Sequence, residues 1–257
     1  MAADLRLIRS MKTLSRALLL SLVALPLAAD PIAEVRAALE RLTAREPIRV
    51  TYEMQRTVAN EGKFDNDKFT GKASVDLEGD ANGMRVVFSR ALLEQVGREQ
   101  DARRKNADQS TPTVSALREI DPVETADAID FAPTLLRLLD GAKLVSDAQA
   151  TWGGKPARAM VIRVADRIDK ENKSRVKVAE NRLTLWLGPD LVPLAAEHLL
   201  NAKFSLLIFK GESKQKKSWH LARVADRLVR VRHEATSTNS GMGQKGNEQV
   251  VATVRVH

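Results

Sequence analysis

Alternation of apolar and polar side chains constrains the fold of this chain more than any other feature of its sequence. Ile48, Val50, Tyr52 and Met54 are separated by charged or polar residues. A period of two places such apolar residues on one face of a β-strand. The same alternation recurs in two shorter stretches, with the apolar members Ala73, Val75 and Leu77, and then Met84, Val86 and Phe88. The pattern predicts three successive strands, each with one apolar face.

A second, longer series of strands is predicted from residue 143 onward. We expect strands over 143–151, 156–166, 175–187, 191–210, 217–234 and 248–256, of which 191–210 is long enough to be two. Turn-forming residues separate them at 153–154, 169–173, 188–190, 211–216 and 237–247. Because no helical period intervenes, this spacing indicates an antiparallel meander and not βαβ units.

Helical patterns occupy two places. Asp30 and Pro31 provide an N-cap and a first-turn proline for an amphipathic helix that reaches about residue 45. A helical insert is expected at about 90–141, and its part from 98 to 108 is almost entirely polar and expected to be solvated or mobile. The insert ends in a short helix that Gly141 can terminate and that carries Leu135, Leu136, Leu138 and Leu139.

The N-terminal residues 1–29 have the composition of an export signal. A short basic stretch precedes an apolar run over 17–25 and then small residues. This order is typical of a cleavable signal peptide, and the run is shorter than the ~18–20 residues that span a bilayer. A signal peptide that began at Met11 would fit this order more closely, so we expect translation to start at residue 1 or 11. We expect cleavage after Ala28 or Ala29, a periplasmic location, and one domain over 30–257.

Composition excludes several classes of function. The chain has no cysteine, which rules out disulfides, thiol nucleophiles, iron–sulfur clusters and lipid attachment at the cleavage site. Aromatic residues make up only 4% of the chain, too few for surfaces that stack on unpaired bases. Removal of residues 1–29 leaves 37 basic and 32 acidic residues, a net charge of +5 instead of +8. We therefore expect no nucleic-acid partner.

No catalytic or metal site can be assembled from the sequence. The four histidines, at 198, 220, 233 and 257, show no paired spacing. His198 and His233 each adjoin a glutamate, but adjacent strand residues point to opposite faces and cannot act as an acid–base pair. In the stretch 121–130, Asp121 and Glu124 have the spacing of a helix capping box, which explains these two carboxylates without chemistry. We expect no enzyme, no metal and no cofactor.

The glycines at 241, 243 and 246 formally satisfy a dinucleotide-binding pattern. That pattern needs a helix after the glycines, because the N-terminus of the helix binds the pyrophosphate. The residues from Asn247 to Val256 alternate as a strand instead. We interpret the segment as a hairpin loop without nucleotide affinity.

A run of basic residues makes one strand region positive. They are Lys210, Lys214, Lys216, Lys217, Arg223, Arg227, Arg230 and Arg232. Such a run is either the solvated face or guarded edge of a sheet or a surface that attracts anionic lipid headgroups. Contact with an anionic membrane surface is therefore one possible partner interaction.

The order of elements resembles that of LolA-like proteins, the periplasmic lipoprotein carriers and their relatives. The resemblance rests on the helix Ile32–Leu42, the strand from Ile48, and the segment Leu183–Pro193, which reads as strand, turn and proline-started strand. It implies a mainly β, α+β fold in which helices cover the concave apolar face of a curved antiparallel half-barrel sheet. The resemblance further implies that the sheet and helices of this chain enclose a cavity for acyl chains.

Two functions remain from this reading. The first is an exported carrier of a lipophilic ligand or of lipoprotein acyl chains. The second is a non-enzymatic envelope protein that uses the same fold to hold or sense another protein. Any apolar face must be buried, either as a closed core or beneath helices that can lift. We expect the concave cavity to be lined by Tyr52, Met54, Val75, Leu77, Val86, Phe88, Leu135 and Leu139.

Overall fold

The computed structural model describes residues 30–62, 68–172, 175–206, 209–241 and 244–257. The signal peptide expected at 1–29 lies outside these ranges. Ten antiparallel strands form one open, curved sheet in the order β3-β2-β1-β10-β9-β8-β7-β6-β5-β4. Apart from β1 beside β10, neighbours in the sheet are neighbours in sequence. The mainly β, α+β half-barrel and the meander expected from the sequence are confirmed.

The strands are β1 (Ile48–Gly62), β2 (Lys68–Asp80), β3 (Gly83–Val87), β4 (Lys143–Trp152), β5 (Lys155–Arg163), β6 (Val176–Leu187), β7 (Pro193–Leu206), β8 (Phe209–Val224), β9 (Arg227–Gly241) and β10 (Gln244–Val256). The helices are α1 (Pro31–Glu40), α2 (Arg90–Lys105), α3 (Pro112–Arg118), α4 (Pro122–Ile129) and α5 (Ala132–Leu139), with a short 3-10 helix η1 (Lys170–Asn172).

Two turns expected in the second half of the chain were wrong. The residues 211–216 lie within β8, and most of 237–247 belongs to β9 and β10. The expected strand 217–234 is instead broken at Ala225 and Asp226, between β8 and β9. Ala225 has a φ of 52°, and the Asp226 carboxylate accepts hydrogen bonds from Thr43 and from two backbone N–H groups of the α1–β1 connection. That anchoring favours a turn without the glycine or asparagine usual in short hairpins.

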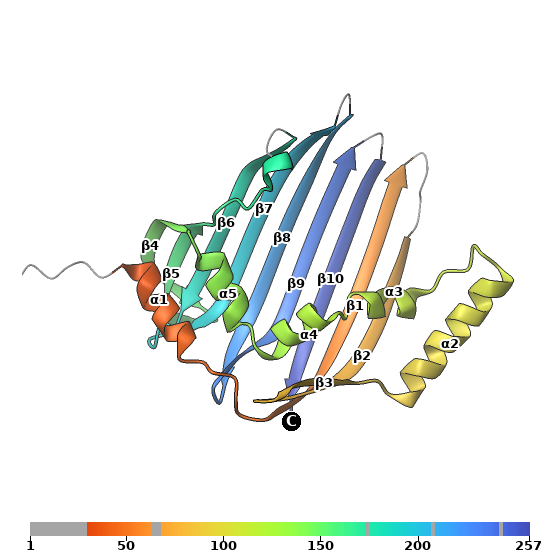
Figure 1. The fold of residues 1–257 in the computed structure, drawn as a ribbon, viewed down its shortest axis with the longest axis horizontal. Coiled ribbons are helices and arrows are strands. Elements are labelled where there is room, and N and C mark those ends of the chain that lie inside the picture. The colour runs from red at the N-terminus through yellow and green to blue at the C-terminus, as the bar shows by residue number, and fades with distance from the viewer. Residues whose placement is uncertain (1–29, 63–67, 173–174, 207–208, 242–243) are drawn as a thin grey trace, which may run out of the picture.

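Helices α1, α3, α4 and α5 lie across one face of the sheet, here called the helix face (Figure 1). The apolar residues of the sheet are divided between two buried clusters. One cluster joins α1 and α5 to β5–β9, and the other joins α4 to β1, β2, β9 and β10. Gly141, with a φ of 68°, follows α5 as expected.

Helix α2 stands beyond β2 at the margin of the sheet (Figure 1). Its charged part is exposed except for Glu99, which is 8% exposed. The Glu99 carboxylate accepts hydrogen bonds from the backbone N–H groups of Thr113 and Val114, each at 3.1 Å, and so caps the start of α3. Helix α3 lies within the helical insert expected at about 90–141, and Pro112 at its first turn is the same start signal as Pro31.

The helices cover only part of their face. In Figure 1 they cross the lower and middle parts of the strands, and the upper ends of β7–β10 extend past them. Cross-strand pairing places His198, Leu200, Ala202 and Phe204 of β7 on the same face as the buried Ala196. Along β7 the upper part of the helix face is therefore open, and its residues are half-buried or exposed. Beside it, Asn181 of β6 is buried and donates hydrogen bonds to Ala165 and Asp166 of the β5–β6 connection.

Candidate functional site

A β-bulge in β9 brings two basic side chains to the middle of the helix face. His220 of β8 pairs with Arg232 and the next residue, Leu221, pairs with Arg230, so that Val231 is an extra residue. In a regular strand, residues 230 and 233 point to opposite faces. The extra residue allows Arg230 and His233 to lie on the same side, beneath α4.

Glu124 of α4 is the centre of the buried polar group on this face. Its carboxylate accepts a 2.6 Å hydrogen bond from the Tyr52 hydroxyl and forms an ion pair with Arg230, which is 2% exposed. His233 Nδ1 lies 3.5 Å from the same carboxylate oxygen. The capping expectation was half right, because Asp121 accepts from the Glu124 backbone N–H at 2.7 Å. The Glu124 side chain itself points into the core.

These contacts fix the charge states of the group. Burial alone raises the pKa of Glu124, but His233, Arg230 and Tyr52 outweigh it and lower the pKa to about 2. Burial, with the neighbouring Glu124 carboxylate, raises the pKa of the Tyr52 phenol. Burial lowers the pKa of His233. At neutral pH the group thus holds one carboxylate and one guanidinium beside a neutral phenol and a neutral imidazole, and it ties α4 to the sheet.

Aromatic rings continue the group toward α5. Trp219 lies between Phe131, at a centroid distance of 4.9 Å, and the His233 ring, stacked at 5.9 Å. Both ring nitrogens of His233 and the indole nitrogen of Trp219 are buried without a hydrogen-bond partner among the described residues. These three nitrogens are closed off from solvent, and the rings pack the group against α5 and β8.

An open pocket of about 250 Å³ lies directly above this group on the helix face. Its lining includes His233 and Glu124 at the base and Lys217, Gln215, Glu248 and Val250 around them. Arg56 pairs with Glu248 at 2.5 Å and with Glu119 at 3.4 Å. Lys217 is half-buried, and within the described ranges no carboxylate pairs with it. Lys217 therefore presents an available ammonium group to the pocket.

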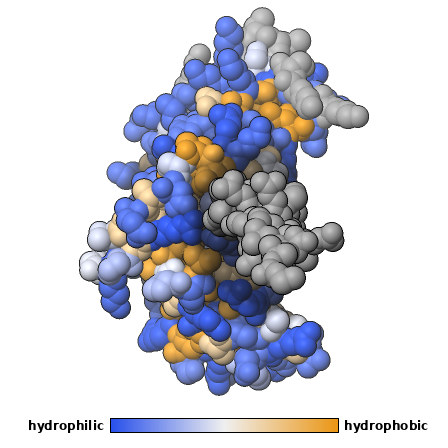
Figure 2. All heavy atoms as spheres, turned by 90° about the vertical axis from the view of Figure 1, so that its left-hand side faces the viewer, coloured by the Kyte–Doolittle hydropathy of each residue, from blue (hydrophilic) through white to orange (hydrophobic). Residues whose placement is uncertain are grey.

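An apolar strip adjoins the pocket along the upper part of β7. His198 lies opposite Lys217, and Leu200, Ala202 and Phe204 follow it on the same face. The Phe204 ring is 44% exposed and lies over Gly211 of β8, where an added Cβ would approach the ring to 2.2 Å. From residue 198 to 204 the strip is about 20 Å long at the rise of a β-strand. Seen from the β4 side, apolar side chains also gather near this upper end of the molecule (Figure 2).

The eight residues expected to line one cavity do not come together. Tyr52, Met54, Val75 and Leu77 are at most 3% exposed and belong to the α4 cluster. Leu135 and Leu139 are at most 2% exposed and belong to the α1–α5 cluster. Val86 packs at the margin of the α4 cluster, and Phe88, just after β3, is 41% exposed. In this structure the helices close over two packed cores, and the open surface is above them.

The basic run is not a continuous positive surface. Arg227 and Arg230 are buried at 3% and 2% exposure, since the bulge and the β8–β9 turn direct them inward. Four of the others have acidic partners within 4 Å: Lys214 with Glu212, Lys216 with Glu197, Arg223 with Asp190, and Arg232 with Glu234. The expectation of one positive strand region is therefore corrected.

The described ranges hold neither a metal-ligand cluster nor a membrane-spanning helix. No three His, Asp or Glu side chains there gather as metal ligands. None of the helices there is long and apolar enough to cross a membrane. Gly241 ends β9 and Gln244 begins β10, so the glycine segment joins two paired strands, although residues 242 and 243 lie outside the described ranges.

No known family model matches the chain, and no curated protein matches it. Solved structures similar to it include a DUF1329 family protein from Desulfovibrio piger, at 11% identity over 88% of this chain and 92% of that one, with a TM-score of 0.29. MucB, solved in complex with MucA(peri), is similar at 9% identity over 87% of this chain and 93% of that one, with a TM-score of 0.18. Likenesses this distant say nothing about a ligand.

Proposed function

We propose that this chain is an exported, non-enzymatic binding protein of the cell envelope. Its ligand is lipophilic, an acyl chain of a lipid or of a lipoprotein, and lies on the open upper part of the helix face. The residues 1–29 support export, because they have the composition of a signal peptide. The ligand lies above the helices and not beneath them, since both cores are packed.

The apolar strip of β7 carries this proposal. Leu200 and Ala202 are half-buried and Phe204 is 44% exposed, on a face that the helices cross lower down. Exposed apolar side chains that adjoin polar groups are typical of ligand-binding surfaces. Lys217 at the lower end of the strip can pair with the polar end of an amphipathic ligand, while the chain of the ligand covers the strip.

The test is native mass spectrometry of the purified exported protein, with extraction of bound lipid. We expect the wild type to carry lipid and Leu200→Glu to lose it, because a carboxylate on the strip repels an acyl chain. Val145→Glu is the matched control, since Val145 is 64% exposed on β4, away from the strip. A wild type that carries no lipid and binds no hydrophobic dye contradicts the proposal.

A second candidate function, an envelope protein that holds another protein, is favoured by one observation. Helix α2 projects past the sheet and leaves a groove between itself and β2. This groove lies apart from the apolar strip of β7 in the sheet order, so the two functions do not exclude each other.

A further inference from the structure

The outer edge of β2 is only partly covered. Strand β3 pairs with Asp76–Asp80 and stops at Val87, opposite Asp76. The chain then turns away at Ser89, which caps α2. For Lys68–Val75, β1 is the sole hydrogen-bonding strand among the described residues. The backbone of this part of β2 therefore has a free edge where a longer β3 would continue.

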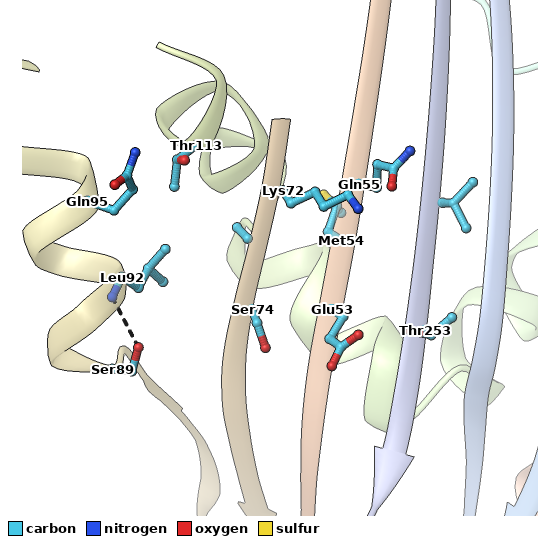
Figure 3. A pocket seen from close by; sticks show the side chains of 12 residues that line it. Glu53, Met54, Gln55, Lys72, Ser74, Ser89, Leu92, Gln95, Thr113 and Thr253 are labelled. Atoms are coloured by element: carbon cyan, nitrogen blue, oxygen red, sulfur yellow. Dashed lines mark hydrogen bonds between the residues drawn. The ribbon is translucent and has the colours of Figure 1, made fainter. Parts of the chain in front are cut away.

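The departure of α2 leaves a groove beside this edge. The groove has a volume of about 490 Å³. It begins beside α2 and extends across β2 to β1 and β10, where Glu53, Gln55 and Thr253 also line it (Figure 3). Ser89, Leu92 and Gln95 come from α2, and Lys72, Ala73 and Ser74 come from β2. Thr113, at the start of α3, closes one end.

The wall formed by α2 is held in place without filling the groove. Glu99 fixes α2 to α3 through its hydrogen bonds to the start of α3. Leu92 packs on the α4 cluster, while its neighbour Leu93 is 54% exposed. Since these contacts exist without any partner, the groove is already formed.

The surroundings of the groove select the chemistry of its occupant. Alternating N–H and C=O groups along a strand edge are satisfied best by another extended polypeptide. The side chains of Ala73 and Ser74 are small and leave room beside the edge. Val87, Phe88 and Leu93 are 39%, 41% and 54% exposed near the β3 and α2 ends that border the groove. A lipid could cover these apolar groups but could not pair with the backbone.

We propose that this groove is a docking site for an extended segment of a partner polypeptide, which pairs with Lys72–Val75 as an added strand. Alternate side chains of the segment are apolar and pack against Leu92, Leu93 and Phe88. This inference rests on the second proposed function and is independent of lipid binding. The opposite edge of the sheet is less suited, because β4 carries a bulge at Val145, a feature that discourages strand addition.

The experiment uses a displayed library of random nine-residue peptides, selected on the mature full-length protein. We expect selected peptides to alternate apolar and polar residues and to slow hydrogen exchange at the amides of residues 70–75. Gln95→Trp, which fills the groove from α2, should weaken binding at least about tenfold. Gln95→Ala removes the 3.2 Å hydrogen bond from Gln95 to Glu99 but leaves the groove open, and should bind nearly as the wild type does.

A second measurement does not depend on the Gln95→Trp variant, and so tests the proposal even if that variant fails to fold. In a paired strand, alternate N–H groups point toward the partner edge. N-methylation of a selected peptide at one set of alternate positions should abolish binding, and methylation at the other set should not. Equal tolerance of both sets overturns the proposal, as does protection elsewhere in the sheet or a selection that returns no binder. Loss of lipid binding by Leu200→Glu leaves this result unchanged, which separates the two claims.

Discussion

Replacement of Glu124 by glutamine removes the carboxylate that forms an ion pair with the buried Arg230. Arg230 is 2% exposed, and the variant keeps side-chain volume but removes the carboxylate that pairs with the guanidinium. Breaking one partner of a buried ion pair typically costs about 3–5 kcal/mol. The pKa gives a second route, because a fall from the ordinary 4.5 to about 2 corresponds to about 3 kcal/mol. We therefore expect Glu124→Gln to lower the free energy of unfolding by about 3 kcal/mol at pH 7.

The sign of the pH dependence follows from the lowered pKa. Because the folded pKa lies below the unfolded one, this stabilisation is complete above about pH 5 and is lost as the pH falls from 4.5 toward 2. Urea unfolding of the wild type and of Glu124→Gln at pH 7 and pH 3 measures the stabilisation that the Glu124 carboxylate provides. The gap between the two proteins should narrow at pH 3. A gap below about 1 kcal/mol at pH 7, or one that is the same at both pH values, refutes the assignment.

Three further outcomes are expected. Leu139→Glu buries a carboxylate in the α1–α5 core, where Leu139 is 2% exposed. It should lower the free energy of unfolding, measured in urea, by several kcal/mol. A decrease within ~0.5 kcal/mol would mean that α5 moves away from the sheet. Gly71→Ala places a Cβ 1.9 Å from the Pro112 carbonyl oxygen. The variant should therefore displace α3 and lower the free energy of unfolding by about 1–3 kcal/mol. Unchanged hydrogen exchange at the α3 amides contradicts this. Burial lowers the pKa of His233 below 6.5, so the free energy of unfolding of the wild type should begin to fall as the pH drops below 6.5. In a pH titration of stability, His233→Gln should not show this first decrease.

The strands were predictable from the sequence where one face of the sheet is buried and the other is exposed to solvent. Ile48, Val50, Tyr52 and Met54 alternate because the helices cover one side of β1, and the sequence shows that period directly. At the upper ends of β8–β10 no helix covers the sheet, so both faces are polar and the period disappears. Residues such as Ser237 and Asn239 resemble turn formers, yet they pair because neighbouring strands are already in place.

The buried polar group was not predictable from local patterns. The extra residue Val231 changes which side chains share a face, and neither a glycine nor a proline marks it. Glu124 resembles half of a capping box, and only the position of α4 over the sheet turns its carboxylate toward Arg230. The division of the expected cavity residues between two clusters depends on which helix covers which strands, and no local pattern shows that.

The central claim is that a lipophilic ligand lies above the helices, along the upper part of β7. Titration of isotopically labelled protein with a spin-labelled fatty acid tests it directly, since the label broadens nearby amide resonances. The account predicts broadening centred on residues 198–204 of β7 and 213–217 of β8. Broadening centred instead on α1 and α5, or none at saturating fatty acid, contradicts it.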